Sequence, residues 1–393
     1  MQTDQIKCPS CYSSIRRKFV YERKRCPVIN NVVYDSYKES RSCLSGDVNL
    51  VYCPICELTF NSSFDKNLIS YDISYNNFRS LSQVYTDHLS QVANICSEWI
   101  SQDDIVLEIG CGKGDFLKKL NDSTGCKGFG YDKSYEGKKN YNKKVVFFDN
   151  YFNPEKTQMN YNAIILRHVL EHVSDPYEFL LKMLNKKIIK HGTHLMIEVP
   201  DIEWIIKNKT FFDITYEHCN YFSKNSLSHL VKRLGWHIEN LQNVYGGQYL
   251  LLNASYNGHL PKNFNHKSNQ ILLSNFKEFE DAKIKFYDVI KTAESACIWG
   301  AAGKGVLVLS EFSDELLKKI KFVVDINPIK QGKYLPLSGK LVVSPDALKT
   351  HKGQLVVIAM NEIYQEEINN TLSSMDVDAI LMSSTLQKCQ LSA

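Results

Sequence analysis

The chain has 393 residues, of which 44% are hydrophobic and 23% are charged, and its formal net charge at pH 7 is +4. This length is enough for two or three domains, and the composition excludes a disordered, collagen-like or coiled-coil chain. The small positive charge also lacks the strong basic excess expected of a nucleic-acid-binding protein.

The sequence shows no signal for export or membrane insertion. It begins MQTDQIKCPSC, without the basic start and apolar run of a signal peptide. No stretch approaches the ~18 apolar residues of a membrane helix. We therefore expect a cytoplasmic protein, in which the twelve cysteines are poor disulfide candidates and are read first as metal ligands.

Residues 1–66 are predicted to form a small zinc-binding module, because this segment has too few apolar residues for a core of its own. Two CxxC knuckles supply four thiolates for structural Zn²⁺: Cys8, Cys11, Cys53 and Cys56. Cys26 and Cys43 lie between the knuckles and are alternative ligands. Four thiolates leave no open coordination position, so we expect the zinc to support folding rather than catalysis.

Residues 67–256 are predicted to form a doubly wound α/β domain. An amphipathic helix is expected over residues 81–100, and short apolar runs then alternate with helical stretches from 104 to about 255. This alternation indicates parallel strands joined by crossover helices. The polar stretch 254–269 is the best candidate for a linker.

Residues 270–393 are predicted to form a second, smaller Rossmann-like domain. A helical span is expected over 271–296, followed by strand candidates at 295–300, 321–325, 340–344, 354–360 and 378–384. The predicted fold class is thus α/β throughout, apart from the zinc-binding module.

A glycine-rich turn follows the first strand of the middle domain. The pattern ExGxGxG is formed by Glu108, Gly110, Gly112 and Gly114. Asp132 and Asp149 end the next two strands, where they can meet ribose hydroxyls and an adenine amino group. Together these positions look like the S-adenosylmethionine site of a class I methyltransferase.

Two further segments follow later strands of the same domain. Arg167 and His168 begin RHVLEH, which resembles the segment that closes over the methionine end of this cofactor. His168 and His172 have a spacing that also suits a metal, but no third ligand is apparent. The later segment 211–223 crowds aromatic residues around one histidine, His218, and is either a site for a proton acceptor or an aromatic core cluster.

The order of these modules resembles the nucleotide-sugar C-methyltransferase family, whose members make branched deoxysugars. The resemblance covers nearly the whole chain and includes the segments 300–305 and 323–336. It implies a nucleotide-linked keto-deoxysugar substrate, with His218 as the base and Glu217 as its partner. Three positions depart from the family pattern and leave the sugar open: Glu57, Asn77 and Tyr216.

The resemblance also implies a reaction in which a carbon is methylated through an enolate. A carbon beside a ketone must lose a proton, and the resulting enolate oxygen needs hydrogen-bond donors, for which Tyr75, Tyr216 and His168 are candidates. Phosphate contacts are expected from Gly303, Lys304 and Lys330, although a packed helix start and a surface lysine explain these residues equally well.

Other functions remain open at this point. The nearest alternative is an O- or N-methyltransferase acting on a nucleotide-linked sugar or another small molecule. A nucleic-acid methyltransferase is disfavoured because no dense basic stripe is present, and a scaffold protein is disfavoured by the intact motifs. We expect neither nucleic acid nor membrane as a partner. The sequence leaves the oligomeric state open, a monomer included.

Overall fold

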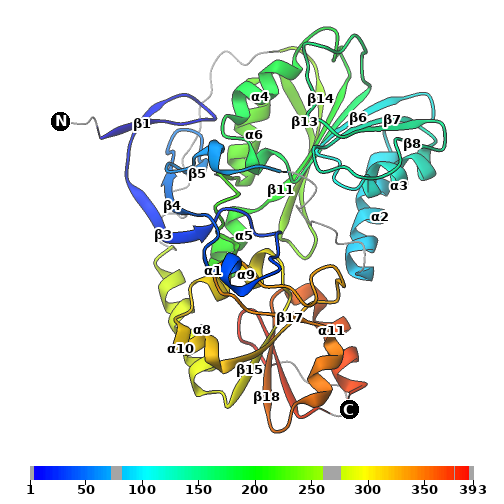
Figure 1. The fold of residues 1–393 in the computed structure, drawn as a ribbon. Helices are drawn as coiled ribbons and strands as arrows, with labels where there is room; N and C mark the ends of the chain where they lie inside the picture. The colour runs from blue at the N-terminus through cyan, green and yellow to red at the C-terminus, as the bar shows by residue number, and fades with distance from the viewer. Residues whose placement is uncertain (1–3, 72–81, 260–275, 376, 389–393) are drawn as a thin grey trace. The chain divides into compact units, whose positions relative to one another are not determined.

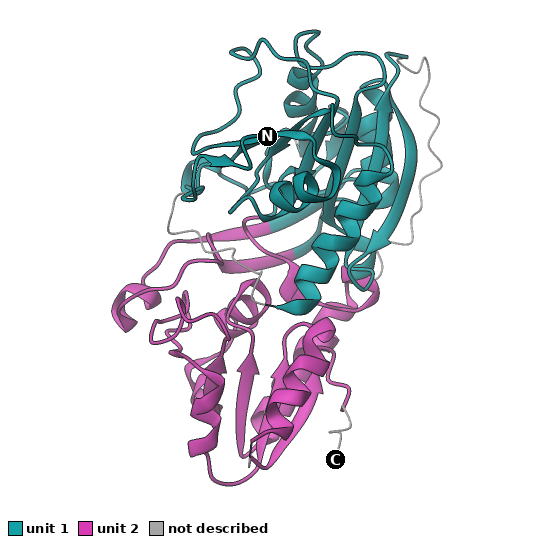
Figure 2. Ribbon diagram, turned by 90° about the vertical axis from the view of Figure 1, so that its right-hand side faces the viewer, with its two compact units in different colours: residues 1–21, 49–204, 218–270 teal, residues 22–48, 205–217, 271–393 magenta. Residues whose placement is uncertain are grey.

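The computed structural model describes residues 4–71, 82–259, 276–375 and 377–388. The chain divides into two compact units, coloured separately in Figure 2. Unit 1 comprises residues 1–21, 49–204 and 218–270, and unit 2 comprises residues 22–48, 205–217 and 271–393. Each unit is therefore built from segments that are distant in the sequence. The predicted domain boundaries at 66 and 256–270 stay a prediction.

Unit 1 contains an eight-stranded sheet with the order β13-β14-β11-β10-β6-β7-β9-β8. The five strands β11, β10, β6, β7 and β9 run parallel, and antiparallel strands flank them on both sides. The strands are β6 (Ile105–Ile109), β7 (Lys127–Tyr131), β8 (Asn140–Tyr141), β9 (Val145–Phe148), β10 (Ala163–Arg167), β11 (His194–Pro200), β13 (Trp236–Val244) and β14 (Tyr249–Tyr256). The predicted Rossmann-like fold class is confirmed.

Helices cover both faces of this sheet (Figure 1). On one face, Leu89 of α2 and Phe116 of α3 pack with Ala163 and other buried strand residues. On the other face, Leu180 of α4 and Leu227 of α6 pack with the strand side chains that point to that side of the sheet, such as Ile164. The helices are α2 (Gln83–Ser97), α3 (Asp115–Thr124), η2 (Leu170–His172), α4 (Pro176–Met183) and α6 (Lys224–Arg233). Burial on both faces explains why the strands read as continuous apolar runs.

The N-terminal part of unit 1 is made of short strands. The strand β1 (Gln5–Lys7) pairs with β2 (Ser14–Arg16), and β5 (Thr59–Asn61) pairs with residues 50–52 of β4 (Ser45–Tyr52) and with β12 (Asn220–Tyr221). A short helix, η1 (Lys66–Leu68), follows. The chain passes between the units within β3 (Phe19–Pro27), β4 and α5 (Ile202–Lys207).

Unit 2 contains a five-stranded, fully parallel sheet with the order β17-β16-β15-β18-β19. Its strands are β15 (Ser295–Trp299), β16 (Ile320–Val324), β17 (Val342–Val343), β18 (Leu355–Ala359) and β19 (Ala379–Ser383). Its helices are α1 (Tyr37–Arg41), η3 (Phe211–Asp213), α8 (Glu278–Thr292), α9 (Gly303–Ser310), α10 (Asp314–Lys319), η4 (Pro345–Thr350), η5 (Glu362–Tyr364) and α11 (Gln365–Ser373). The helical span predicted over 271–296 ends earlier than expected, because Ser295 and Ala296 begin β15.

Within the described part of the chain, no helix is both long and apolar enough to cross a membrane.

Candidate functional site

The glycine-rich turn lies where β6 ends and α3 begins. Gly110, Gly112 and Gly114 all adopt positive φ angles, of 75°, 54° and 78°. A Cβ atom at Gly110 would lie 2.3 Å from Val169 Cγ2, and one at Gly114 would lie 2.6 Å from the Phe147 ring. Both the backbone conformation and the close packing therefore require glycine, and the turn leaves backbone N–H groups at the start of α3.

Two carboxylates follow the neighbouring parallel strands β7 and β9. Asp132 Oδ2 accepts a hydrogen bond from Gly112 N at 2.8 Å, and Asp132 Oδ1 accepts one from Ser134 N at 2.7 Å. Asp149 is exposed directly after β9. Because Asp132 is tied to the glycine turn, its carboxylate has a fixed position from which it could bind hydroxyl groups of a ligand.

A buried carboxyl and a buried guanidinium lie near the ends of β6 and β10. Glu108 is 1% exposed, and burial raises the pKa of its carboxyl to about 8, although the cation of Arg167 lowers it in part. Arg167 is 7% exposed, and its guanidinium lies 4.5 Å from the centre of the Phe116 ring. Among the described residues, Glu108 Oε2 and Arg167 Nη2 have no hydrogen-bond partner.

Glu198 in β11 holds this arrangement together and was not expected from the sequence. Its Oε2 accepts a hydrogen bond from Arg167 Nε at 2.6 Å, and its Oε1 lies 2.5 Å from His88 Nε2. Burial raises the pKa of Glu198. The charge of Arg167 and the hydrogen bond with His88 lower this pKa by more than burial raises it, so the carboxyl stays ionised. The available signal was an acidic residue inside an otherwise apolar strand, HLMIEV.

His168 is placed beside both Glu198 and Glu171. Its φ angle is 53°, its backbone N–H donates to Glu198 O at 2.8 Å, and its ring nitrogens lie 3.7 Å from Glu198 Oε1 and 3.5 Å from Glu171 Oε1. His168 therefore joins the buried charges of β10 and β11 to a second cluster of titratable groups.

This second cluster contains Glu171, His172 and His218. One ligand-type atom of each residue lies within 4.8 Å of the others, and the His172 and His218 rings are 4.8 Å apart. Glu171 is 1% exposed, whereas His172 and His218 are half-buried. Tyr71 Oη lies 2.8 Å from His172 Nδ1. Sequence spacing alone shows no third ligand near His168 and His172, but the fold brings His218 to His172 from a distant segment.

The carboxyl beside His218 is thus that of Glu171. Burial raises the pKa of Glu171, but three neighbouring histidines lower it more, so that it lies below its usual value: His168, His172 and His218. An ionised carboxylate among imidazoles can stabilise a protonated histidine, which is what a base becomes after it takes up a proton.

The side chain of Glu217 lies elsewhere, in unit 2. Its carboxylate accepts a hydrogen bond from the backbone N–H of Asn30, whose side-chain amide donates to Thr215 Oγ1. Tyr216 is 1% exposed, and its ring fills the space that a Cβ at Gly46 would take. Glu217 and Tyr216 therefore make these contacts within unit 2, and neither is part of the Glu171, His172 and His218 cluster.

The other predicted site residues are placed as follows. Tyr75 and Asn77 lie outside the described residues. Lys304 pairs with Asp213 at 2.8 Å. Lys330 is 5% exposed and donates to Ala301 O at 3.0 Å, while a Cβ at Gly303 would meet open space. Lys304 and Lys330 therefore both make contacts within unit 2.

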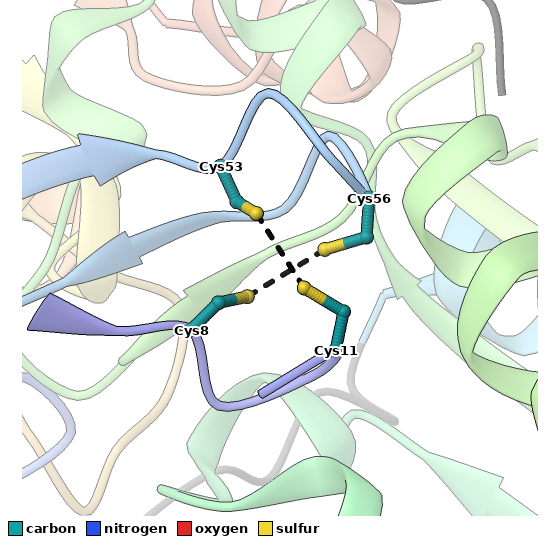
Figure 3. Close-up of side chains that lie close together, drawn as sticks. All are labelled: Cys8, Cys11, Cys53 and Cys56. Atoms are coloured by element: carbon teal, nitrogen blue, oxygen red, sulfur yellow. Dashed lines mark hydrogen bonds between the residues drawn. The ribbon is translucent and has the colours of Figure 1, made fainter. Parts of the chain in front are cut away.

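The four predicted zinc ligands come together in unit 1, with their sulfur atoms pointing toward one centre (Figure 3). The Cys8–Cys56 and Cys11–Cys53 sulfur distances are 3.5 and 3.6 Å. Four thiolates around Zn²⁺ at ~2.3 Å would have sulfur atoms about 3.8 Å apart. The cluster therefore fits a zinc ion, and the alternatives Cys26 and Cys43 are not part of it.

The two CxxC knuckles have the same backbone geometry. In each, the fourth residue after the first cysteine donates its N–H to that cysteine's carbonyl, Tyr12 to Cys8 at 3.0 Å and Glu57 to Cys53 at 2.8 Å. Tyr12 and Glu57 have φ angles of 64° and 63°. This left-handed conformation explains why glycine is usual at position 57 in the resembling family, and Glu57 adopts it with its carboxylate bound by Asn225 Nδ2 at 2.9 Å.

The comparisons with known proteins match two parts of the chain. Residues 79–241 match a model described as a methyltransferase domain. Residues 271–378 match a model described as a C-methyltransferase C-terminal domain.

Individual relatives are more distant. The uncharacterized protein MJ1252 of Methanocaldococcus jannaschii is 31% identical over 134 residues, which are 33% of this chain and 52% of that protein, so the chain spans about half of its relative's length. The solved 1,6-didemethyltoxoflavin-N1-methyltransferase of Burkholderia thailandensis is 13% identical with a TM-score of 0.36, over 54% of this chain and 95% of that chain. The solved N,N-8-amino-8-demethyl-D-riboflavin dimethyltransferase RosA of Streptomyces davawensis is 15% identical with a TM-score of 0.35, over 44% of this chain and 55% of that chain.

Proposed function

We propose that the chain, which contains a match to a methyltransferase domain followed by a match to a C-methyltransferase C-terminal domain, uses S-adenosylmethionine to methylate a carbon beside the ketone of a nucleotide-linked keto-deoxysugar. The observation that carries this proposal is the cluster of Glu171, His172 and His218. Carbon methylation needs a base for the substrate, and this cluster provides one near the carboxyl ends of the parallel strands.

The residues proposed to hold the cofactor surround the glycine-rich turn. They are Glu108, Gly110, Gly112, Gly114, Asp132, Asp149, Arg167 and His168. Glu108 Oε2 and Arg167 Nη2, which are buried and have no hydrogen-bond partner among the described residues, support a polar ligand at this turn. When bound, S-adenosylmethionine supplies an electrophilic methyl group.

His218 is proposed to act as the general base. It takes the proton from the carbon beside the ketone, the C–H bond breaks, and the electron pair moves into an enolate whose oxygen becomes negative. Glu171 stabilises the imidazolium that forms, because its carboxyl stays ionised beside the histidines. General base catalysis of this kind contributes about 10²- to 10⁴-fold.

Hydrogen-bond donors are proposed to stabilise the enolate oxygen. Tyr71 and His172 form a hydrogen-bonded pair beside His218, and this contact supports including them with His168, Tyr75 and Tyr216 as candidates. Glu217 is proposed to position the loop that carries His218, since its carboxylate binds the backbone of Asn30.

The nucleotide handle is proposed to bind unit 2 near Gly303, Lys304 and Lys330. The C-methyltransferase C-terminal domain that spans residues 271–378 supports this placement. Lys304 would have to leave Asp213 to meet a phosphate, whereas buried Lys330 would act by fixing the loop at Ala301.

The test is an exchange experiment in D₂O with S-adenosylmethionine and a panel of nucleotide-linked keto-sugars. The wild-type protein should exchange deuterium at the carbon beside the ketone and add one methyl group there. His218→Asn should lose both, while its affinity for S-adenosylhomocysteine stays unchanged, because the base acts only in the reaction. His237→Asn changes an exposed histidine and serves as the matched control.

Two outcomes would contradict the proposal. Exchange at the wild-type rate in His218→Asn would remove His218 as the base. Methyl transfer to oxygen or nitrogen without exchange at carbon would replace the proposed reaction by the O- or N-methyltransferase alternative.

A further inference from the structure

The two CxxC knuckles of unit 1 carry equivalent residues whose side chains are not part of the cysteine cluster. Tyr12 and Glu57 occupy the same place in the two knuckles, with φ angles of 64° and 63°. This left-handed conformation favours glycine, so a large side chain at either position carries a conformational cost. Such a cost indicates that the side chain has a role, and the contacts of the two residues indicate which role.

Tyr12 is bound to the segment that carries two residues of the base cluster, which comprises Glu171, His172 and His218. The Tyr12 hydroxyl donates to the carboxylate of Asp175, whose two oxygens lie 3.0 and 2.9 Å from Tyr12 Oη. Asp175 follows His172 by three residues and is the N-cap of α4. The first knuckle therefore fixes the chain directly after η2.

Glu57 is bound in a similar way to the chain that follows His218. Its side chain is buried, and its carboxylate accepts from Asn225 Nδ2 at 2.9 Å. Asn225 lies in the first turn of α6, the helix that follows β12. The strand β12 begins two residues after His218 and pairs with β5, which begins two residues after Glu57. The second knuckle therefore fixes the chain directly after His218.

The two segments that carry the base cluster also contact each other. Asn220 Nδ2 donates to Val173 O at 2.6 Å, and Cys219 Sγ donates to Glu171 O at 3.4 Å. In addition, Asn61 N of β5 donates to Cys219 O at 2.9 Å. The base cluster thus lies on two short segments that are bonded to each other and that are each bound to one knuckle.

We propose that Tyr12 and Glu57 are positioning residues for the base cluster. Through these two side chains, the cysteine knuckles hold η2 and the backbone around His218 in the arrangement that proton transfer needs. A reacting group must be held within about 0.5 Å of its productive position, which requires such supporting contacts. This inference rests on the proposed role of His218 as the base. It also gives a reason for a buried glutamate at a position whose backbone conformation favours glycine.

The hydroxyl of Tyr12 can be removed without its ring. Tyr12→Phe loses the hydrogen bond to Asp175 and keeps the ring, which packs edge-on against the Tyr177 ring at 5.0 Å. Tyr141→Phe is the matched control, because Tyr141 Oη also binds a carboxylate, that of Asp122, at 3.0 and 2.8 Å. Tyr141 lies in β8 and Asp122 in α3, and neither element carries a residue of the base cluster.

The carboxylate of Glu57 can be removed or replaced by an amide. Glu57→Gly loses the contact with Asn225 and suits the left-handed backbone. Glu57→Gln keeps a side-chain oxygen that can accept the same hydrogen bond, so it should behave as the wild type. Elemental analysis should show the metal content of the wild type in every variant, because the four cysteines are unchanged.

Ring ¹⁵N NMR spectra of the histidines report on the base cluster without substrate, with His172 and His218 assigned by substitution. Tyr12→Phe should shift the ring signals of His172, and Glu57→Gly should shift those of His218. Amide hydrogen exchange should become faster in residues 170–175 and 218–222, respectively. Glu57→Gln and Tyr141→Phe should change none of these signals or rates.

The exchange reaction in D₂O then measures the effect on proton transfer. Tyr12→Phe and Glu57→Gly should lower kcat for deuterium incorporation by about 10- to 100-fold, because a small displacement of a reacting group is this costly. Their affinity for S-adenosylhomocysteine should stay unchanged, which a general loss of structure would not allow. Glu57→Gln should keep the wild-type rate.

Unchanged ring signals of His172 and His218 in both Tyr12→Phe and Glu57→Gly would overturn the inference. Shifted signals with a wild-type rate of deuterium incorporation would overturn it too, since the contacts would then be structural only. If Tyr12→Phe fails to fold, the comparison of Glu57→Gly with Glu57→Gln decides. A wild-type protein that incorporates no deuterium would contradict the proposed function, and the ring signals alone would then decide whether the knuckles position the cluster.

Discussion

The residue that faces His218 comes from a different part of the chain than its sequence neighbour Glu217. Glu171 lies in η2, directly after β10, and its buried carboxylate stays ionised among three histidines. Glu217 instead accepts from the Asn30 backbone. Although Glu217 and His218 are adjacent in the sequence, their side chains have different partners. His218 belongs to the cluster with Glu171 and His172, and Glu217 is bound to Asn30 within unit 2.

We expect Glu171→Gln to slow deuterium exchange into the substrate strongly, by about 10²-fold or more, because the imidazolium of His218 loses its counter-charge. Glu217→Gln is the matched control, since an amide oxygen can still accept the hydrogen bond from Asn30. The rates are measured by mass spectrometry in D₂O. A larger loss in Glu217→Gln than in Glu171→Gln would return the role of partner to Glu217.

Glu108 makes stability depend on pH in the absence of cofactor. Its pKa in the folded protein is raised to about 8 from an ordinary value of 4.5, so the folded state holds the proton more tightly than the unfolded state. The stability from this proton is complete below the unfolded pKa and is lost as pH rises through about 8. Urea unfolding of the wild type should therefore lose up to ~1.4 kcal/mol per pH unit between pH 6 and 8.

Glu108→Gln should remove this part of the pH dependence, while the exposed Glu136→Gln should keep it. Identical slopes in all three proteins would show that Glu108 is already ionised at pH 6.

At the scale of elements, the two knuckles show how a repeated local motif brings four cysteine sulfur atoms together. Their backbone turns are alike, and their four sulfur atoms converge. The strands β1, β2 and β5 have only three residues each. Strands this short have little stability of their own, so a metal held by the knuckles would stabilise this part of unit 1.

Cys53→Ser should lose the zinc, for which structural sites supply ~10–16 kcal/mol in peptides at pH 7. Hydrogen exchange should then increase in β1, β2 and β5, while the strands of the eight-stranded sheet stay protected. Cys43→Ser is the matched control and should retain one zinc per chain by elemental analysis. Zinc retained in Cys53→Ser, or lost in Cys43→Ser, would contradict the assignment of the ligands.

At the scale of the whole molecule, unit 2 is assembled from three distant segments. Arg23, from the first segment, donates to Ile214 O in the second at 3.2 Å and to Leu307 O in the third at 2.6 Å. It also pairs with Glu311 at 3.0 Å, and Lys283 lies 3.1 Å from the same carboxylate. One buried cation thus joins all three segments of unit 2.

Arg23→Met should destabilise the full chain by about 3–5 kcal/mol, because its removal leaves buried acceptors without their cation. The loss should appear as faster hydrogen exchange in residues 205–217 and in α9. Lys24→Met is the matched control: Lys24 forms an exposed pair with Asp47, so this substitution should change the stability far less. Equal stability of the two variants would show that Arg23 does not join the segments.

The sequence by itself determined the features that depend on local chemistry. Gly110 and Gly114 require their conformations within a few residues, the CxxC spacing defines each knuckle, and apolar runs that alternate with helical stretches predict a parallel sheet. The α/β fold class, the methyltransferase domain and the zinc-type cluster were therefore predictable.

Only the tertiary structure decided which distant residues meet. Glu171 reaches His218, and Glu198 reaches both Arg167 and His88, through strand order and side-chain direction rather than sequence spacing. Likewise, residues 22–48 and 205–217 join unit 2 through contacts that no local pattern encodes. Long-range pairing depends on the packing of the whole chain, because a side chain's partner is set by the register of strands and not by its neighbours.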